Sequence, residues 1–152
     1  MPSKPTYRCS AALPLLICWE STSADEMRLV KNPLVSVIDD DLSVREATTS
    51  LLESHGYITA AFASAEEFLG SERLQDTSCL VTDVRMPGVS GVDLQRRLLK
   101  AGHRIPTIFM TAYPEEHMRA AAMDGGALAF LTKPVNEERL ISCLEGALDK
   151  RQ

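Results

Sequence analysis

The stretch from residue 34 to residue 41 reads LVSVIDDD, a short apolar run that stops at three consecutive aspartates. The aliphatic and β-branched residues of Leu34–Ile38 predict a buried strand, which Asp39-Asp40-Asp41 ends. Four more apolar runs of similar length follow along the chain, and each predicts another strand. These runs are Tyr57–Phe62, Cys79–Thr82, Ile105–Met110 and Ala127–Leu131.

Amphipathic segments predict a helix after each of the five strands, because their apolar residues recur every three or four positions. Gly56 is predicted to end the first helix, Ser64–Glu67 has the spacing of a capping box, and Asn136 is predicted to cap the last helix. Strands that alternate with helices indicate an α/β fold. We expect a doubly wound, five-stranded parallel sheet with five helices and the flavodoxin-like strand order 2-1-3-4-5.

This domain is predicted to span residues 33–150, with residues 1–32 as a poorly ordered N-terminal extension. Residues 11–19 are apolar and follow basic residues, as in a secretory signal peptide, but Pro14 interrupts the run. We therefore favour a leader without a fold of its own, or translated sequence ahead of a true start at Met27.

Composition and charge exclude several classes of function. The formal net charge is −5 and no run of Lys and Arg occurs, so the chain is not expected to bind nucleic acid directly. No apolar stretch has the length of a membrane span. The four cysteines are scattered and lack metal-ligand spacing, which favours reduced thiols in a cytoplasmic protein.

Polar side chains stand where four of the predicted strands end. Asp39 and Asp40 follow the first strand, Asp83 the third, Thr111 the fourth and Lys133 the fifth. The carboxyl ends of parallel strands meet at one edge of the sheet, where α/β proteins bind their ligands. We therefore expect three carboxylates, one hydroxyl and one ammonium group to converge there.

Clustered carboxylates favour a divalent cation such as Mg²⁺ or Mn²⁺. Two carboxylates about 4 Å apart repel by roughly 4 kcal/mol at a surface-like dielectric, and a hard dication removes that penalty. Asp40, Asp83 and the backbone carbonyl of Arg85 are predicted to be ligands. Asp39 is predicted to hold a metal-bound water.

The same group of side chains suits phosphoryl transfer. A carboxylate can attack phosphorus and form an aspartyl phosphate, and Asp83 is the candidate nucleophile. Lys133 and the cation would offset the charge of the transferring group, and the Thr111 hydroxyl could hydrogen-bond a phosphoryl oxygen.

Four fragments together resemble the signatures of response-regulator receiver domains, members of the CheY-like superfamily. They occur in the order and spacing of that family, and each stands at a strand end. Asp83–Gly91 resembles most closely the receivers of nitrogen-fixation and LuxR-type regulators. The four fragments are Val37–Asp41, Thr82–Gly88, Met110–Ala112 and Phe130–Pro134.

The resemblance implies a role for each residue of this edge in bacterial two-component signalling. Asp83 would be the phosphoacceptor, the Asp39–Asp40 pair would bind the metal, and Lys133 would contact the phosphoryl group. The donor would be a sensor histidine kinase or a phosphotransfer protein. Such a chain assists its own phosphorylation and dephosphorylation without being an enzyme.

The resemblance also implies a switch and an output surface. Phe130 would turn inward when Thr111 moves toward the phosphate, and Arg85 and Tyr113 would tune the phosphate's lifetime. Output would pass to a protein partner through the face formed by the fourth predicted helix, the fifth strand and the last helix. Homodimerisation is compatible with this family.

Two other classes of function stay open, as does the form of the output. A phosphohydrolase with an aspartyl-phosphate intermediate would need a second Asp two residues after the nucleophile, where this chain has Arg85. An interaction module independent of phosphorylation would not need the acidic pair, Thr111 and Lys133 together.

A stand-alone receiver and the front of a longer transcription regulator are both compatible with the sequence.

Overall fold

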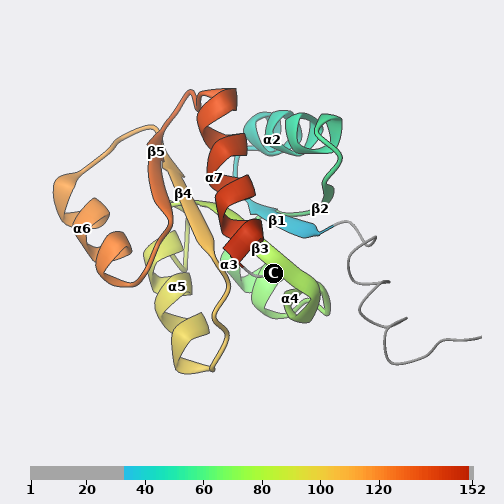
Figure 1. The fold of residues 1–152 in the computed structure, drawn as a ribbon. Helices are drawn as coiled ribbons and strands as arrows, with labels where there is room; N and C mark the ends of the chain where they lie inside the picture. Colours follow the sequence, from blue (N-terminus) through green and yellow to red (C-terminus); the bar gives the residue numbers. More distant parts are fainter. Residues whose placement is uncertain (1–32, 151–152) are drawn as a thin grey trace, which may run out of the picture. The chain divides into compact units, whose positions relative to one another are not determined.

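The computed structural model describes residues 33–150, which fold around one parallel sheet (Figure 1). The strand order is β2-β1-β3-β4-β5, as predicted, and every neighbouring pair is parallel. The interpretations of residues 1–32, including the signal peptide and Met27, lie outside the described residues. The strands are β1 (Leu34–Ile38), β2 (Ile58–Phe62), β3 (Thr77–Asp83), β4 (Thr107–Thr111) and β5 (Ala129–Thr132).

Within residues 33–150 the chain forms six helices, one more than predicted. The additional helix, α4, is a single short turn just before β3, too short to show a helical period in the sequence. Its residue Leu74 is buried, which anchors the turn against the core. The helices are α2 (Leu42–Ser54), α3 (Ala65–Leu69), α4 (Arg73–Asp76), α5 (Gly91–Lys100), α6 (Glu116–Asp124) and α7 (Glu137–Lys150).

Helices cover both faces of the sheet (Figure 1). On one face, α2 and α7 pack on β1, β3, β4 and β5 in one apolar cluster. On the other face, α3, α4 and α5 contribute to a second cluster, and α5 and α6 to a third. Because helices cover both faces of the sheet, all five residues of β1 and of β4 are buried.

The helix ends predicted at Gly56, Ser64 and Asn136 are present: α2 ends at Ser54, and Gly56 follows with a φ of +91°. The cap at the start of α2 was not predicted. Asp41, the third aspartate of the acidic run, caps α2 by accepting the backbone N–H groups of Ser43 and Val44. Ser64 Oγ accepts the Glu67 N–H at the start of α3. Asn136 Oδ1 accepts the Arg139 N–H at the start of α7.

Three strand boundaries differ from the prediction by two residues at one end. β4 begins at Thr107 rather than Ile105, because Pro106 has no N–H for the ladder. β3 begins at Thr77 and β5 at Ala129. β4 ends at Thr111, one residue after Met110, which pairs with Asp83. Thr111 therefore lies at the same edge of the sheet as the end of β3.

No helix in the part of the chain that the structure describes is long and apolar enough to cross a bilayer.

Gly91 packs directly behind the last residue of β3. Its N–H donates to the Val84 carbonyl over 2.9 Å. A Cβ at this position would stand 2.3 Å from the Asp83 carbonyl oxygen and 3.1 Å from the Phe109 ring. The start of α5 can therefore approach the end of β3 only because residue 91 has no side chain.

We expect Gly91→Ala to lower the free energy of unfolding by roughly 1–3 kcal/mol, because the added methyl group overpacks this contact. Gly146→Ala in α7 is the matched control. Nothing lies within 4 Å of a Cβ there, so the same substitution should stabilise the helix by about 0.5–1 kcal/mol. Urea unfolding followed by circular dichroism measures both. Equal effects of the two substitutions would contradict the packing argument.

Candidate functional site

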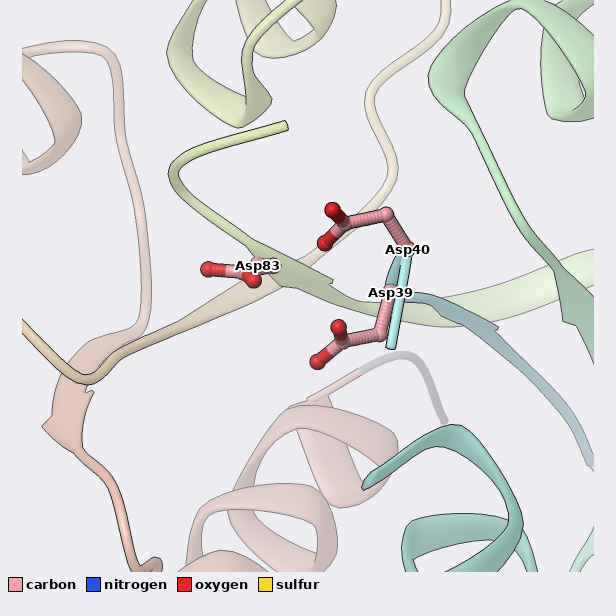
Figure 2. A group of neighbouring side chains, drawn as sticks. All are labelled: Asp39, Asp40 and Asp83. Carbon is pink, nitrogen blue, oxygen red and sulfur yellow. The ribbon is translucent and has the colours of Figure 1, made fainter. Parts of the chain in front are cut away.

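Three carboxylates meet at the carboxyl edge of the sheet. Asp39 and Asp40 follow β1, and Asp83 is the last residue of β3. One carboxylate oxygen of each lies within 4.8 Å of the others. Figure 2 shows the three side chains around the adjacent ends of the two strands. The sequence therefore predicted correctly that these residues come together.

Lys133 joins two of these carboxylates. It follows β5, on the far side of β4, and its backbone N–H donates to the Thr111 carbonyl over 2.8 Å. Its Nζ lies 2.7 Å from Asp39 Oδ2 and 3.1 Å from Asp83 Oδ2. All three side chains are largely buried, so the ion pairs are shielded from solvent.

The three carboxylates have different surroundings. Asp39 is fully buried, and its Oδ1 accepts the Asp41 N–H at 2.9 Å. The Arg45 guanidinium donates to the Asp39 backbone carbonyl over 2.6 Å. Asp83 Oδ1 accepts the Arg85 N–H at 3.3 Å. Asp40 is exposed, and among residues 33–150 no donor is bonded to its carboxylate.

This donor set fits a hard divalent cation. Asp40 keeps its oxygens available beside Asp83 and Asp39, and an all-oxygen set of this kind suits Mg²⁺ or Mn²⁺. Lys133 neutralises only part of the negative charge of three neighbouring carboxylates. Which residues bind a metal stays a prediction.

Burial changes the pKa of both partners of the central ion pair. Burial raises the pKa of Asp83 above its ordinary value, and this outweighs the opposing effect of Lys133. Burial lowers the pKa of Lys133, but its hydrogen bonds to Asp39 and Asp83 outweigh that effect, so the pKa is raised overall. Lys133 therefore stays charged at neutral pH, whereas the charge on Asp83 is costly without a further cation.

The predicted switch residues lie next to this cluster. Thr111 is buried, and its Oγ1 accepts the Tyr113 N–H at 3.1 Å, which leaves the hydroxyl hydrogen to donate. Phe130 is half-buried in β5, with its ring 6.4 Å from that of Phe109. Tyr113 is 72% exposed. In the described residues no hydrogen bond joins Thr111 or Tyr113 to Asp83.

Arg85 turns its side chain away from the carboxylates. Its guanidinium forms an ion pair with Glu115, which precedes α6, and both side chains are substantially exposed. Only the backbone N–H of Arg85 contacts Asp83. These contacts do not test whether Arg85 affects the lifetime of the phosphate, and that effect stays a prediction.

Sequence reasoning missed three residues around the site: Arg45, Glu66 and Glu115. Arg45 bonds the Asp39 carbonyl, Glu66 accepts the Val89 N–H at 3.4 Å, and Glu115 pairs with Arg85. Arg45 and Glu66 lie in the first turns of helices and Glu115 directly precedes one, and charged residues at such positions have many uses. No local pattern separates these three from their neighbours, so only the fold could identify them.

A sequence profile of the response regulator receiver domain matches residues 35–145. Nodulation protein W of Bradyrhizobium diazoefficiens is 42% identical over 117 residues, which cover 77% of this chain and 52% of that protein. The transcriptional regulatory protein FixJ of Azorhizobium caulinodans is 40% identical over 116 residues, 76% of this chain and 55% of that protein. The family resemblance drawn from the four motifs is confirmed.

The fold agrees with solved structures as well. The crystal structure of FixJ-N superposes with a TM-score of 0.71 and 34% sequence identity, covering 79% of this chain and 96% of that chain. The chain spans about half the length of the relatives named above. What those whole proteins do therefore does not follow from the shared part.

We expect Asp83→Asn to stabilise the metal-free protein near neutral pH by roughly 0.5–2 kcal/mol, because it removes a buried charge and leaves Lys133 paired with Asp39. The folded state binds the Asp83 proton more tightly than the unfolded chain does. The wild type therefore gains stability as the pH falls from above the raised pKa of Asp83 toward its ordinary value of 3.8. The advantage of the variant should shrink over that range.

Urea unfolding in the presence of EDTA, near neutral pH and at mildly acidic pH, measures this effect. Asp76→Asn is the control, since Asp76 is exposed and stands just before the opposite end of β3. A destabilised Asp83→Asn protein, or a difference from wild type that does not depend on pH, would contradict the assignment of a costly buried charge.

Proposed function

Because the chain belongs to the response regulator receiver family of two-component systems, we propose that it receives a phosphoryl group on Asp83 and uses this modification as a signalling switch. The observation that carries the proposal is the contact of Lys133 Nζ with Asp83 Oδ2, beside the Asp39–Asp40 pair. A nucleophilic carboxylate, a fixed cation and a cluster of oxygen donors thereby lie together at one edge of the sheet.

Asp83 acts as the nucleophile in this proposal. One of its carboxylate oxygens forms the bond to phosphorus while the bond from phosphorus to the nitrogen of a donor phosphohistidine breaks. The imidazole leaves with the electron pair of that bond. The Lys133 ammonium stands against Asp83 Oδ2 and offsets negative charge as the phosphoryl group arrives.

Mg²⁺ or Mn²⁺ is the proposed cofactor. Asp40, Asp83 and the Arg85 carbonyl would hold the ion, with Asp39 orienting a bound water. When bound, the ion supplies positive charge that neutralises the carboxylates and the phosphoryl oxygens. Asp39 is already committed to Lys133 and to the Asp41 N–H, which supports an indirect role for it.

The proposed switch links Asp83 to the output face. The Thr111 hydroxyl would turn from the Tyr113 N–H toward a phosphoryl oxygen, and half-buried Phe130 would move into the space that Thr111 leaves. Phe130 lies in β5, between α6 and α7. These three elements form the proposed output face, for a protein partner or for a second copy of the chain. Arg85 and Tyr113 would tune the lifetime of the phosphate.

The proposed partners are those of a cytoplasmic two-component system: a sensor histidine kinase or a phosphotransfer protein as donor, and a protein target as recipient of the signal. FixJ is a transcriptional regulatory protein. The present chain could serve either as a stand-alone receiver or as the receiver of a longer regulator. The sequence of the complete gene would distinguish these forms.

A phosphohydrolase is less well supported. Such an enzyme needs an acid or base two residues after its nucleophile. Arg85 occupies that position, and its guanidinium is paired with Glu115.

Acetyl phosphate with Mg²⁺ should label the wild-type protein at Asp83. Asp83→Asn should reduce the label to background because the nucleophile is lost, Asp40→Asn should slow labelling strongly, and EDTA should abolish it. Phos-tag electrophoresis and intact-protein mass spectrometry measure the label. Asp76→Asn, at the other end of β3, should be labelled like the wild type. Unchanged stoichiometry in Asp83→Asn would refute the proposal.

Thr111→Val should uncouple modification from the switch. The substitution keeps the β-branched shape but removes the hydroxyl, so beryllofluoride should still bind while the change in the Phe130 ring is lost. Aromatic NMR signals of Phe130, with and without beryllofluoride, report this. Thr107→Val is the control, because Thr107 is equally buried at the opposite end of β4. A Thr111→Val protein with the full wild-type change of Phe130 would exclude Thr111 as the coupling residue.

A further inference from the structure

The loop from residue 84 to residue 90 connects the phosphoacceptor strand β3 to α5. It carries Arg85, whose N–H bonds Asp83 Oδ1 and whose carbonyl is a proposed metal ligand. At its far end, the Gly91 N–H bonds the Val84 carbonyl and closes the loop. The backbone path between these two points therefore decides where the Arg85 carbonyl points.

We propose that Glu66, in the first turn of α3, is a positioning residue for the metal site, because its carboxylate fixes the outer turn of this loop. The inference rests on the function proposed above. It adds a residue that contacts neither the metal nor the phosphoryl group and acts through the backbone of residues 84–90.

The Glu66 carboxylate approaches the backbone of the loop at two adjacent residues, Val89 and Gly88. Glu66 Oε2 accepts the Val89 N–H at 3.4 Å. A Cβ on Gly88 would stand 2.5 Å from the same oxygen, and Gly88 has a φ of +80°. Glycine at position 88 thus permits both the turn and the approach of the carboxylate.

The Val89 N–H depends on this acceptor. Val89 is 8% exposed and belongs, with Met86 and Phe68, to the apolar cluster that includes α3. The hydrogen bond is part-buried, and a backbone N–H that is shielded from water needs a partner. Within the described residues Glu66 is the acceptor for this group. Loss of the carboxylate would leave the N–H to find another partner by moving the loop.

The neighbouring glutamate has a different role. Glu67 Oε1 accepts the Ala63 N–H at 3.3 Å, and its N–H donates to Ser64 Oγ, so its contacts stay within its own helix start. Both glutamates are exposed and lie in the same helical turn. They form a natural pair for a controlled comparison.

The Arg85–Glu115 ion pair also touches the loop but constrains it less. It joins the ends of two long side chains that are 53% and 40% exposed. Ion pairs of that kind are screened by salt and contribute little, and they leave the peptide planes of the loop free to rotate. Glu66 instead bonds the backbone itself.

The test compares two substitutions of Glu66 in the full chain. Glu66→Gln keeps the reach and the acceptor but removes the charge, whereas Glu66→Asp keeps the charge but shortens the arm. We expect Glu66→Asp to weaken Mg²⁺ binding about tenfold, as the loss of a residue that orients a metal ligand does. Glu66→Gln and the control Glu67→Asp should stay close to the wild type.

Titration of the ¹⁵N-labelled protein with MgCl₂ gives the dissociation constants from amide shifts near Asp83. Hydrogen exchange of the Val89 amide in the metal-free protein is the second readout, and it should be faster in Glu66→Asp than in Glu67→Asp. Affinity in Glu66→Asp equal to that in Glu67→Asp would overturn the inference. So would a loss in Glu66→Gln as large as in Glu66→Asp, since charge alone would then explain it.

Asp40→Asn separates this result from a failure of the proposed function. If the wild type binds no Mg²⁺, or if Asp40→Asn does not weaken binding, the metal site itself is wrong and the inference fails with it. If Asp40→Asn weakens binding but Glu66→Asp does not, only the positioning role of Glu66 is wrong.

Discussion

The ion pair that Lys133 makes with Asp39 and Asp83 is the interaction on which the rest of the site depends. Three carboxylates stand close together at one edge of the sheet, and two of them are buried. Loss of Lys133 would leave two buried carboxylates without their cation, and an uncompensated buried charge of this kind costs about 3–5 kcal/mol. Lys133 makes the buried pair tolerable, while exposed Asp40 keeps oxygens for a cation. The protein can therefore fold with these three carboxylates close together. With Lys133 as their one cation among the described residues, the group still carries a net negative charge.

Two close approaches of the backbone position this cluster. Gly91 lets α5 start directly behind Asp83, and Gly88 lets Glu66 reach the loop that follows β3. Both contacts act on residues between Asp83 and α5. The order of the strands adds the remaining constraint, since β3 lies between β1 and β4 and thus between the acidic pair and Thr111. Asp39 and Thr111 are held by β1 and β4, whose residues are all buried.

The strengths and failures of sequence reasoning follow from the range of the interactions involved. The strands were predictable because parallel strands buried on both faces are continuous apolar runs. Helix ends at Gly56, Ser64 and Asn136 were predictable because capping uses backbone groups two or three residues away. The turn α4 was missed because four residues carry no helical period. The start of β4 was misplaced because the predicted strand included Pro106, which has no N–H for the ladder.

The sequence by itself determined the α/β class and, through the resemblance to a known fold, the strand order. It also determined the convergence of Asp39, Asp40, Asp83, Thr111 and Lys133, because residues at the ends of parallel strands must share one edge. Only the tertiary structure decided how these groups differ: which carboxylates Lys133 bonds, which one stays exposed, and that burial raises the pKa of Asp83. Those properties depend on distances between residues far apart in the chain. No local pattern of residues encodes such distances, and the same holds for the contacts of Glu66 and Glu115.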